Sequence, residues 1–259
     1  MESDPDVRVF ITGASSGIGE ALARHYAAQG ASLGLFARRA SELARVARTL
    51  APARVECYAG DVRDAAALER AANAFTARVG VPDVVVANAG ISTGTVTGHA
   101  EDLSAFERVF GTNVLGMVNT FHPFITPMRE RRHGTLVGIA SVAGFRGLPG
   151  SGAYSASKAA AIAYLESLRV ELRAARIAVV TVCPGYIATP MTDGNPYPMP
   201  FLMQPDVAAR KIARAIARRK RFYVLPWPMA LAGAVFRALP RPLFDRVFAN
   251  APHKPRDRA

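Results

Sequence analysis

Short apolar segments alternate with longer amphipathic segments along almost the whole chain of 259 residues. The apolar segments, which are expected to be strands, cover residues 7–12, 31–36, 54–58, 83–87, 134–139, 177–183 and 222–225. The segments between them that are expected to be helices have apolar side chains at three- and four-residue intervals and cover residues 17–29, 40–50, 65–79, 112–131 and 153–176. Strands that alternate with helices form parallel sheets covered on both faces. The sequence therefore predicts an α/β fold, a doubly wound parallel sheet of about seven strands in three layers, α/β/α.

The composition fits one globular α/β domain, with 50% apolar and 20% charged residues. The N-terminal residues MESDPDVRV carry acids where a signal peptide would carry basic residues, so we expect a cytoplasmic protein. The two cysteines, Cys57 and Cys183, form no metal-binding motif, and the five histidines form no cluster. We therefore expect reduced cysteines and no metal site.

A glycine-rich turn, TGASSGIG, joins the first expected strand to the first expected helix. Glycines at this position let the backbone turn tightly and let a phosphate reach the N-terminus of the helix, where free N–H groups favour negative charge. The spacing is GxxxGxG and not the better-known GxGxxG, but the position between strand and helix indicates a nucleotide cofactor in a Rossmann-type fold. The residues expected to hold it here are Gly13, Ser15, Ser16, Gly17, Ile18 and Gly19.

The end of the second expected strand reads LFARR and bears on which nucleotide binds. Loops that bind NAD place an acid at this point for the ribose 2′-hydroxyl, whereas an arginine accommodates the 2′-phosphate of NADP. Here Ala37 stands where the acid would be, and Arg38 and Arg39 follow. We predict NADP(H); the alternative is that the two arginines only begin a solvated helix.

The segment YSASK sets Tyr154 and Lys158 four residues apart in an expected helix, so both side chains lie on one face, with Cβ atoms about 5–6 Å apart. A nearby cation favours the phenolate electrostatically. We therefore expect Lys158 to lower the pKa of Tyr154 toward the range that is useful for proton transfer.

Together with NAG at residues 88–90, Asn113, Ser141 and PG at residues 184–185, these motifs resemble the short-chain dehydrogenase/reductase family. The similarity runs from about residue 7 to residue 190, and the joint pattern is far more specific than YxxxK alone. The resemblance implies hydride transfer between a nicotinamide and a carbonyl or alcohol, in a protein that acts on small molecules.

The resemblance also implies a role for each matching residue. Tyr154 would be the general acid or base, and Lys158 would also hold the nicotinamide ribose. Ser141 would polarise the substrate carbonyl, and Asn113 would maintain a water chain to Lys158. The remaining cofactor contacts implied are Asp61 at the adenine, then Val62, Asn88, Ala89, Gly90, Pro184 and Gly185, with Ile187 and Thr189 at the carboxamide.

Two segments rich in apolar residues are expected to enclose the substrate: the lid at about residues 190–205 and GFRGLPG at residues 144–150. Surfaces built from methionine, proline and aromatic residues suit a lipophilic ketone or aldehyde. The alternative is that these residues only pack against one another over the sheet.

The net charge of +12 is concentrated near the C-terminus, because residues 205–259 contain thirteen Lys or Arg and only three acids. We expect a catalytic domain over residues 1–226 and a basic amphipathic extension over residues 227–259. The uncharged run 222–236 is too short to span a membrane. The extension could lie on an anionic membrane surface, or its apolar face could cover a neighbouring subunit or the substrate entrance. No nucleic-acid motif accompanies the charge, so nucleic acid is not expected as a partner.

Three functions remain open from the sequence. The first is an NADP-dependent carbonyl reductase or alcohol dehydrogenase. The second is a reductase of 3-oxoacyl thioesters on a carrier protein or coenzyme A, with the basic extension as docking surface. The third is a nucleotide-binding regulatory or membrane-associated protein without turnover, which the intact set of Asn113, Ser141, Tyr154 and Lys158 disfavours. The helices expected over residues 112–131 and 153–176 resemble the pair through which family members dimerise, so we expect a homodimer.

Overall fold

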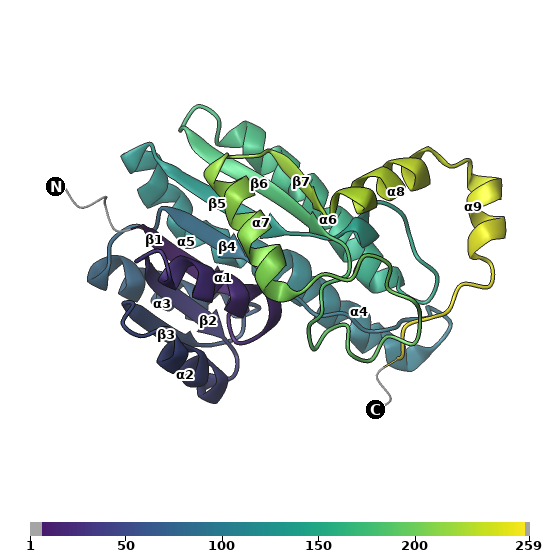
Figure 1. Cartoon of the computed structure of the whole chain (residues 1–259), viewed down its shortest axis with the longest axis horizontal. Helices are drawn as coiled ribbons and strands as arrows, with labels where there is room; N and C mark the ends of the chain where they lie inside the picture. Colours follow the sequence, from purple (N-terminus) through teal and green to yellow (C-terminus); the bar gives the residue numbers. More distant parts are fainter. Residues whose placement is uncertain (1–6, 257–259) are drawn as a thin grey trace.

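A computed structural model describes residues 7–256, and within them a single sheet of seven strands forms the centre of the molecule (Figure 1). Every pair of neighbouring strands is parallel. In sheet order the strands are β3 (Val55–Ala59), β2 (Ser32–Ala37), β1 (Arg8–Thr12), β4 (Val84–Ala87), β5 (Gly134–Ile139), β6 (Ile177–Pro184) and β7 (Phe222–Leu225). The predicted fold class and the seven strands are confirmed, each strand within one residue of its expected bounds at either end.

Helices cover both faces of the sheet, which gives the three predicted layers. One apolar core joins the sheet to α1 (Gly17–Ala27), α2 (Ala40–Thr49) and α7 (Pro205–Ala217). The other core joins it to α3 (Ala65–Arg78), α5 (Gly116–Arg131) and α6 (Gly152–Glu171). The central strands are buried on both faces, which explains why they read as continuous apolar runs without alternation.

The order of the strands reverses direction between β1 and β4, because the chain moves outward to β2 and β3 before it returns. In sheets of this kind a crevice forms outside the carboxyl ends of the strands at the point of reversal. Thr12 ends β1 and Ala87 ends β4, so the segments that follow them face each other across this crevice. The topology therefore brings the glycine turn and the NAG segment together.

Two helix predictions were inexact, and each has a local cause. The helix expected over residues 112–131 begins as a π-helical turn, Gly111–Leu115, before α5, and it follows directly on an unpredicted helix, α4 (Leu103–Phe110). The helix expected to end at Arg176 ends at Glu171, since the chain then makes a turn in which Arg176 has a φ of 58°. A positive φ is incompatible with a continuing right-handed helix.

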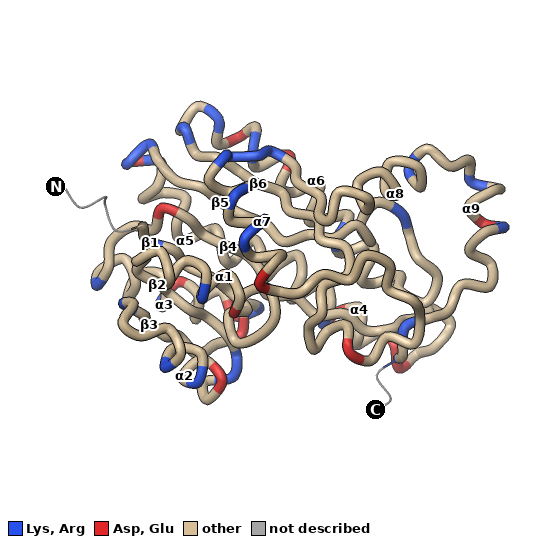
Figure 2. The backbone as a smooth tube through the Cα atoms, in the orientation of Figure 1, with Lys and Arg blue, Asp and Glu red and all other residues tan. Residues whose placement is uncertain are grey.

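The C-terminal part forms two short helices, α8 (Trp227–Ala238) and α9 (Arg241–Phe248), which project from one end of the molecule (Figure 1). Many of the basic residues of this part lie on the α7 to β7 connection and on α8 and α9 (Figure 2). Within residues 7–256 no helix is long and apolar enough to cross a membrane. The acidic N-terminal residues, on which the cytoplasmic prediction rests, lie outside the described residues, and the division at residue 226 stays a prediction.

Candidate active site

The glycine turn after β1 is held against the end of β4 by one side chain. The Nδ2 atom of Asn88 donates to the carbonyl oxygens of Thr12, at 3.0 Å, and Gly13, at 3.1 Å. Gly13 has a φ of 66°, and a Cβ placed on it would lie 2.8 Å from the Cα of Ala89. A Cβ on Gly19 would collide with the carbonyl oxygen of Gly13. Only glycine permits this approach of two backbones, so the turn keeps an open cradle at the N-terminus of α1.

A cavity of about 280 Å³ extends from this cradle along the carboxyl ends of the strands. All but one of the residues predicted to bind the cofactor line it, and Gly19 is the exception because it packs behind Gly13. The predicted residues in the lining are Gly13, Ser15, Ser16, Gly17, Ile18, Arg38, Arg39, Asp61, Val62, Asn88, Ala89, Gly90, Tyr154, Lys158, Pro184, Gly185, Ile187 and Thr189. Sequence reasoning missed several further residues of the lining, which lie at or just after the ends of strands or of α4 and carry no recognisable signal: Gly60, Ile91, Thr112, Ile139 and Ala140.

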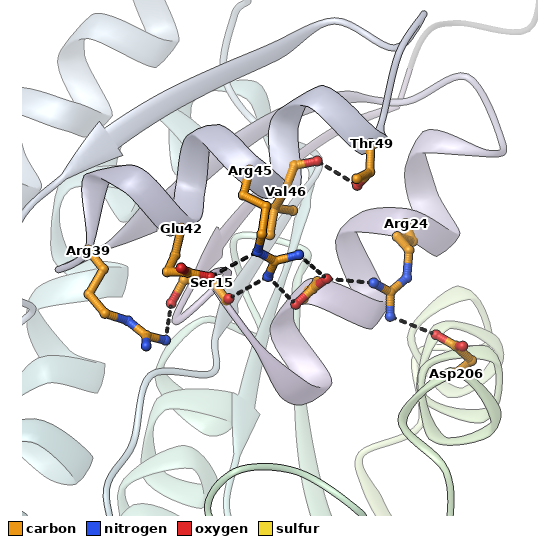
Figure 3. Close-up of polar contacts among 9 residues, drawn as sticks. Ser15, Arg24, Arg39, Glu42, Arg45, Val46, Thr49 and Asp206 are labelled. Carbon is orange, nitrogen blue, oxygen red and sulfur yellow. Dashed lines mark hydrogen bonds and ion pairs between the residues drawn. The ribbon is translucent and has the colours of Figure 1, made fainter.

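Two arginines, Arg38 and Arg39, line the cavity at the end of β2, and Figure 3 shows Arg39 beside Ser15 and Arg45. Arg38 and Arg39 are exposed, and Arg39 lies 3.4 Å from the Ser15 hydroxyl, to which it donates. The sequence analysis missed Arg45, which donates to the Ser15 carbonyl and to both Glu20 and Glu42. These bonds link the glycine turn to α2, so the backbone that carries the exposed Arg38 and Arg39 is held in place.

Asp61 lies at the far end of the cavity, after β3. Its carboxylate forms an ion pair with Arg63 at 2.7 Å. Hydrogen bonds from the Arg63 side chain are the main cause of a lowered pKa for Asp61, so this group is ionised at neutral pH. An ionised acceptor here fits the predicted contact with an adenine amino group, which donates hydrogen bonds.

The α6 helix places Tyr154 and Lys158 on one face, as the spacing predicted. The Nζ atom of Lys158 lies 5.8 Å from the centroid of the Tyr154 ring and donates to the carbonyl oxygen of Ile139 at 2.8 Å. Burial lowers the pKa of Lys158 from its ordinary 10.5 to about 8. Lys158 is therefore a buried amine that gives up its proton more readily than an exposed lysine.

The expectation that Lys158 lowers the pKa of Tyr154 is not met in this structure. Burial raises the pKa of Tyr154, and the hydrogen bond with Ser141 only partly offsets that rise. The reason is desolvation, which disfavours the phenolate, while the Lys158 ammonium is directed to the Ile139 carbonyl. Tyr154 is consequently a protonated donor at neutral pH.

Ser141 follows β5 and lies beside Tyr154 at the edge of the cavity. Its hydroxyl accepts from the Ala143 N–H at 3.1 Å and lies 3.4 Å from the Pro184 carbonyl oxygen, to which it donates. It is also the N-cap of the short 3-10 turn Val142–Gly144, which fixes its direction. The cap role and a role toward substrate are therefore compatible.

Asn113 lies in the π-helical turn behind the cavity and does not line it. Its Oδ1 atom accepts from the Ile91 N–H at 2.8 Å, and its Nδ2 atom donates to the Ile91 carbonyl and to the Ser157 hydroxyl, each at 3.0 Å. Ser157 in turn donates to the Tyr154 carbonyl at 2.8 Å. Asn113 thus ties the NAG segment to the helix that carries Tyr154. The water chain from Asn113 to Lys158 stays a prediction.

A second cavity, of about 440 Å³, opens from the same tyrosine. It shares Ser141, Tyr154, Gly185, Met191 and Thr192 with the first cavity. Both segments predicted to enclose the substrate contribute to its walls, with Phe145, Arg146 and Leu148 from the one and Met191, Asn195, Tyr197, Pro198, Pro200 and Phe201 from the lid. The two cavities therefore meet at Ser141 and Tyr154.

The C-terminal extension forms the remaining wall of this second cavity. Its contributions are Met229, Ala232, Gly233, Phe236, Phe244, Phe248 and Lys254. Gly233 lies so close to Phe145 that a Cβ there would overlap the ring. The inner faces of α8 and α9 therefore cover the second cavity, and the role of the extension toward a substrate stays a prediction.

The fold and the first cavity define a dinucleotide-binding α/β protein. The family model for short chain dehydrogenases matches residues 8–197, and the chain therefore belongs to that family of oxidoreductases. An uncharacterized oxidoreductase of Myxococcus xanthus is 38% identical over 238 residues, which cover 91% of this chain and 94% of that protein.

Two solved structures show the same fold. A 3-oxoacyl-(acyl-carrier protein) reductase from Brucella melitensis has a TM-score of 0.74 and 32% identity, with 84% of this chain and 88% of that chain covered. An alcohol dehydrogenase from the archaeon Thermococcus sibiricus, solved as a complex with 5-hydroxy-NADP, has a TM-score of 0.75 and 28% identity, with 85% and 94% covered.

The burial of Lys158 predicts a pH-dependent stability. Below pH 8 Lys158 is protonated in both the folded and the unfolded chain. The folded state therefore carries the full cost of about 3 kcal/mol for the burial of this charge. Between pH 8 and 10.5 the folded state loses the proton first, and its stability rises. Lys158→Met should therefore be about 2 kcal/mol more stable than wild type at pH 7, after the loss of about 1 kcal/mol from its hydrogen bond.

Urea denaturation at pH 7 and pH 10, without added nucleotide, measures this difference, which should shrink at the higher pH. The exposed Lys211→Met on α7 is the matched control and should show no such dependence. A Lys158→Met variant that is less stable than wild type at pH 7 would contradict the conclusion that the buried charge of Lys158 destabilises the fold.

Proposed function

We propose that the protein is an NADP(H)-dependent oxidoreductase that interconverts a lipophilic ketone or aldehyde and the corresponding alcohol. The observation that carries this proposal is the junction of the two cavities at Ser141 and Tyr154. One cavity has the glycine cradle and arginines suited to a dinucleotide, and the other has mainly aromatic, proline and methionine walls. A reacting carbonyl at the junction would lie beside a proton donor, the Tyr154 hydroxyl.

Each residue of the junction has a task in this proposal. When bound, NADP(H) supplies or accepts the hydride. Ser141 orients and polarises the carbonyl oxygen. Tyr154 holds the proton that this oxygen takes up, and its raised pKa keeps the phenol protonated for reduction. Lys158 holds the nicotinamide ribose, and Asn113 keeps α6 and the NAG segment in register through Ile91 and Ser157.

The preference for NADP rests on the end of β2. Ala37 lines the cavity without a carboxylate, and the exposed Arg38 and Arg39 are in reach of a 2′-phosphate. The Thermococcus sibiricus relative was solved with an NADP derivative, which supports the same choice.

A second candidate is a 3-oxoacyl-thioester reductase. The name of the Brucella melitensis relative and the basic C-terminal part favour it. The aromatic side chains that α8 and α9 contribute to the cavity wall favour a free lipophilic substrate. We therefore place the thioester function second.

We also propose a homodimer formed through α5 and α6. Apolar side chains that are unusually exposed lie on or beside these helices, with Leu115 60% and Val170 64% exposed. Exposed apolar patches of this kind mark interaction surfaces.

The outer faces of α8 and α9 support a contact with an anionic membrane surface. Trp227, Leu231 and Val235 recur at four-residue intervals on α8 and are 75%, 62% and 53% exposed. On α9 the exposed Leu243 and Val247 repeat this spacing. Arg237, Arg241 and Arg246 are interleaved with them and are exposed. A helix face of this composition suits the interface of an anionic bilayer.

The reaction itself is tested by absorbance at 340 nm with NADPH and a panel of aldehydes, ketones, steroids and acyl thioesters. Wild type should oxidise NADPH with at least one free carbonyl compound, and Tyr154→Phe should lower kcat by about 10²- to 10⁴-fold because the proton donor is lost. Preference for a thioester would favour the second candidate. Tight NADPH binding without turnover on any member would favour a regulatory protein.

The cofactor preference is tested with Ala37→Asp. A carboxylate at this position would repel the 2′-phosphate and accept from a 2′-hydroxyl, so the ratio of kcat/KM for NADPH to that for NADH should fall by about 100-fold. Ala44→Asp, on the exposed side of α2, adds the same charge away from the cavity and should leave the ratio within about twofold of wild type. An unchanged ratio in Ala37→Asp would refute the proposed phosphate site.

Trp227 is the only tryptophan of the chain and reports on the membrane contact. Its fluorescence should shift to the blue with vesicles that contain phosphatidylglycerol, less so with pure phosphatidylcholine, and the shift should weaken in high salt. Arg241→Ser combined with Arg246→Ser should weaken binding by about tenfold or more, since each basic residue contributes about 1 kcal/mol. The exposed pair Arg70→Ser and Arg173→Ser is the control. A spectrum unaffected by anionic vesicles would rule the contact out.

A further inference from the structure

The segment that follows α9 turns back across the molecule and lies against the chain around residues 92–102 (Figure 1). The N–H of Gly94 donates to the Pro255 carbonyl oxygen at 2.9 Å, and Gly94 and Arg256 pair as an isolated parallel bridge. A Cβ on Gly94 would overlap the Lys254 carbonyl oxygen. The segment is thus laid closely on the loop after β4.

An ion pair fixes the end of this segment. The Arg256 guanidinium donates to Asp102 from Nε at 2.8 Å and to Glu101 from Nη2 at 2.8 Å. Asp102 is only 2% exposed and also accepts from the Val96 N–H at 2.7 Å. The hydrogen bonds from Arg256 are the main cause of the lowered pKa of Asp102, so the pair stays ionised at neutral pH. Bidentate pairs between arginine and carboxylate set position as well as energy.

Two residues before Arg256, Lys254 reaches the wall of the second cavity. Its Nζ atom donates to the Ser92 hydroxyl at 3.0 Å and to the Met191 carbonyl at 3.1 Å. Both contacts join the C-terminal segment to the residues that flank the cavity mouth. Lys254 therefore places a positive charge at the wall of a largely apolar cavity.

The charged residues in the described lining of this cavity are Arg146 and Lys254, and no carboxylate is among them. Arg146 is held by the fold, since its guanidinium donates to the carbonyls at the end of α8 and lies 4.3 Å from the centroid of the Phe244 ring. Lys254 has a flexible stem and rotatable donors, so it can turn toward a ligand. A positively charged wall without acids selects against cationic substrates and for anionic ones.

A side-chain amide adds a second polar group. Asn195 lines the same cavity, and its Oδ1 atom is buried without a hydrogen-bond partner among the described residues. The Nδ2 atom of this amide donates to the Met199 sulfur at 3.5 Å. A thioether is a weak acceptor, so rotation of the amide would offer its N–H group to a ligand at little cost. The cavity can thus provide both a cation and a neutral donor.

We infer that the substrate carries a carboxylate in addition to its reacting carbonyl, and that Lys254 binds this carboxylate. The inference rests on the proposed function and names the substrate class, lipophilic oxo acids and the matching hydroxy acids. The apolar walls hold the aliphatic chain, and the charge-assisted hydrogen bond at Lys254 sets its direction. Arg256 is a positioning residue, because it holds the segment that carries Lys254.

The test compares an ω-oxodecanoate with its methyl ester, two substrates that differ at the acid end by the negative charge and one methyl group. With NADPH, wild type should prefer the acid by about tenfold or more in kcat/KM. In Lys254→Met this ratio should fall to near one, whereas the exposed Lys211→Met should keep the ratio of wild type. Arg256→Gln should lower the ratio in part, and Arg256→Lys should give a ratio between those of Arg256→Gln and wild type. The double variant of Lys254→Met with Arg256→Gln should have a ratio no lower than that of Lys254→Met alone.

A binding measurement separates this inference from the proposed function. Calorimetry with decanoate and decanol, without NADPH, should give an affinity ratio that falls by about tenfold in Lys254→Met and not in Lys211→Met. If the ester is reduced but the acid has no advantage in wild type, or keeps it in Lys254→Met, the carboxylate site is wrong and the oxidoreductase proposal stands. If no carbonyl compound is reduced, the oxidoreductase proposal fails and calorimetry alone decides on the site.

Discussion

The approach of two backbones at the carboxyl edge of the sheet is the constraint on which the rest of the site depends. Gly13 and Ala89 come so close that neither loop could move outward without the loss of the Asn88 bonds that join them. This contact exists because β1 and β4 are neighbours at the point where the strand order reverses. It fixes the phosphate cradle on one side and the NAG segment on the other. Asn113 also fixes the position of α6 relative to this edge, because it donates to Ser157, which in turn donates to the Tyr154 carbonyl.

Burial of a lysine costs free energy, so the packing of the core does not by itself explain why Lys158 is buried. Lys158 is almost fully buried and bonds to a backbone carbonyl, so its charge destabilises the fold at neutral pH. Tyr154 beside it is buried enough to resist ionisation. Two neighbouring groups whose pKa values are shifted in opposite directions, that of the lysine down and that of the tyrosine up, are typical of a site that moves protons. The residues that weaken the fold are therefore the ones that a catalytic proposal needs.

The sequence predicted the features that local pattern determines. Burial on both faces produces continuous apolar runs, so the strands could be placed almost to the residue. The glycine turn and the Tyr154 to Lys158 spacing are local as well. The π-helical turn at Asn113 could not be predicted, since no pattern in GTNVL marks one extra residue per turn. The contact of Arg256 with Asp102 joins residues 154 positions apart and depends on the path of the whole chain. The same holds for Lys254 at the cavity wall.

The extension is apolar on two faces, and this explains why the sequence left its role open. On α8, Met229, Ala232 and Gly233 face the cavity, while Trp227, Leu231 and Val235 face outward. A helix that served only as a roof would carry polar residues on its outer face. The two faces therefore differ in role: the inner face closes the cavity, and the outer face is the one for which we propose a membrane contact.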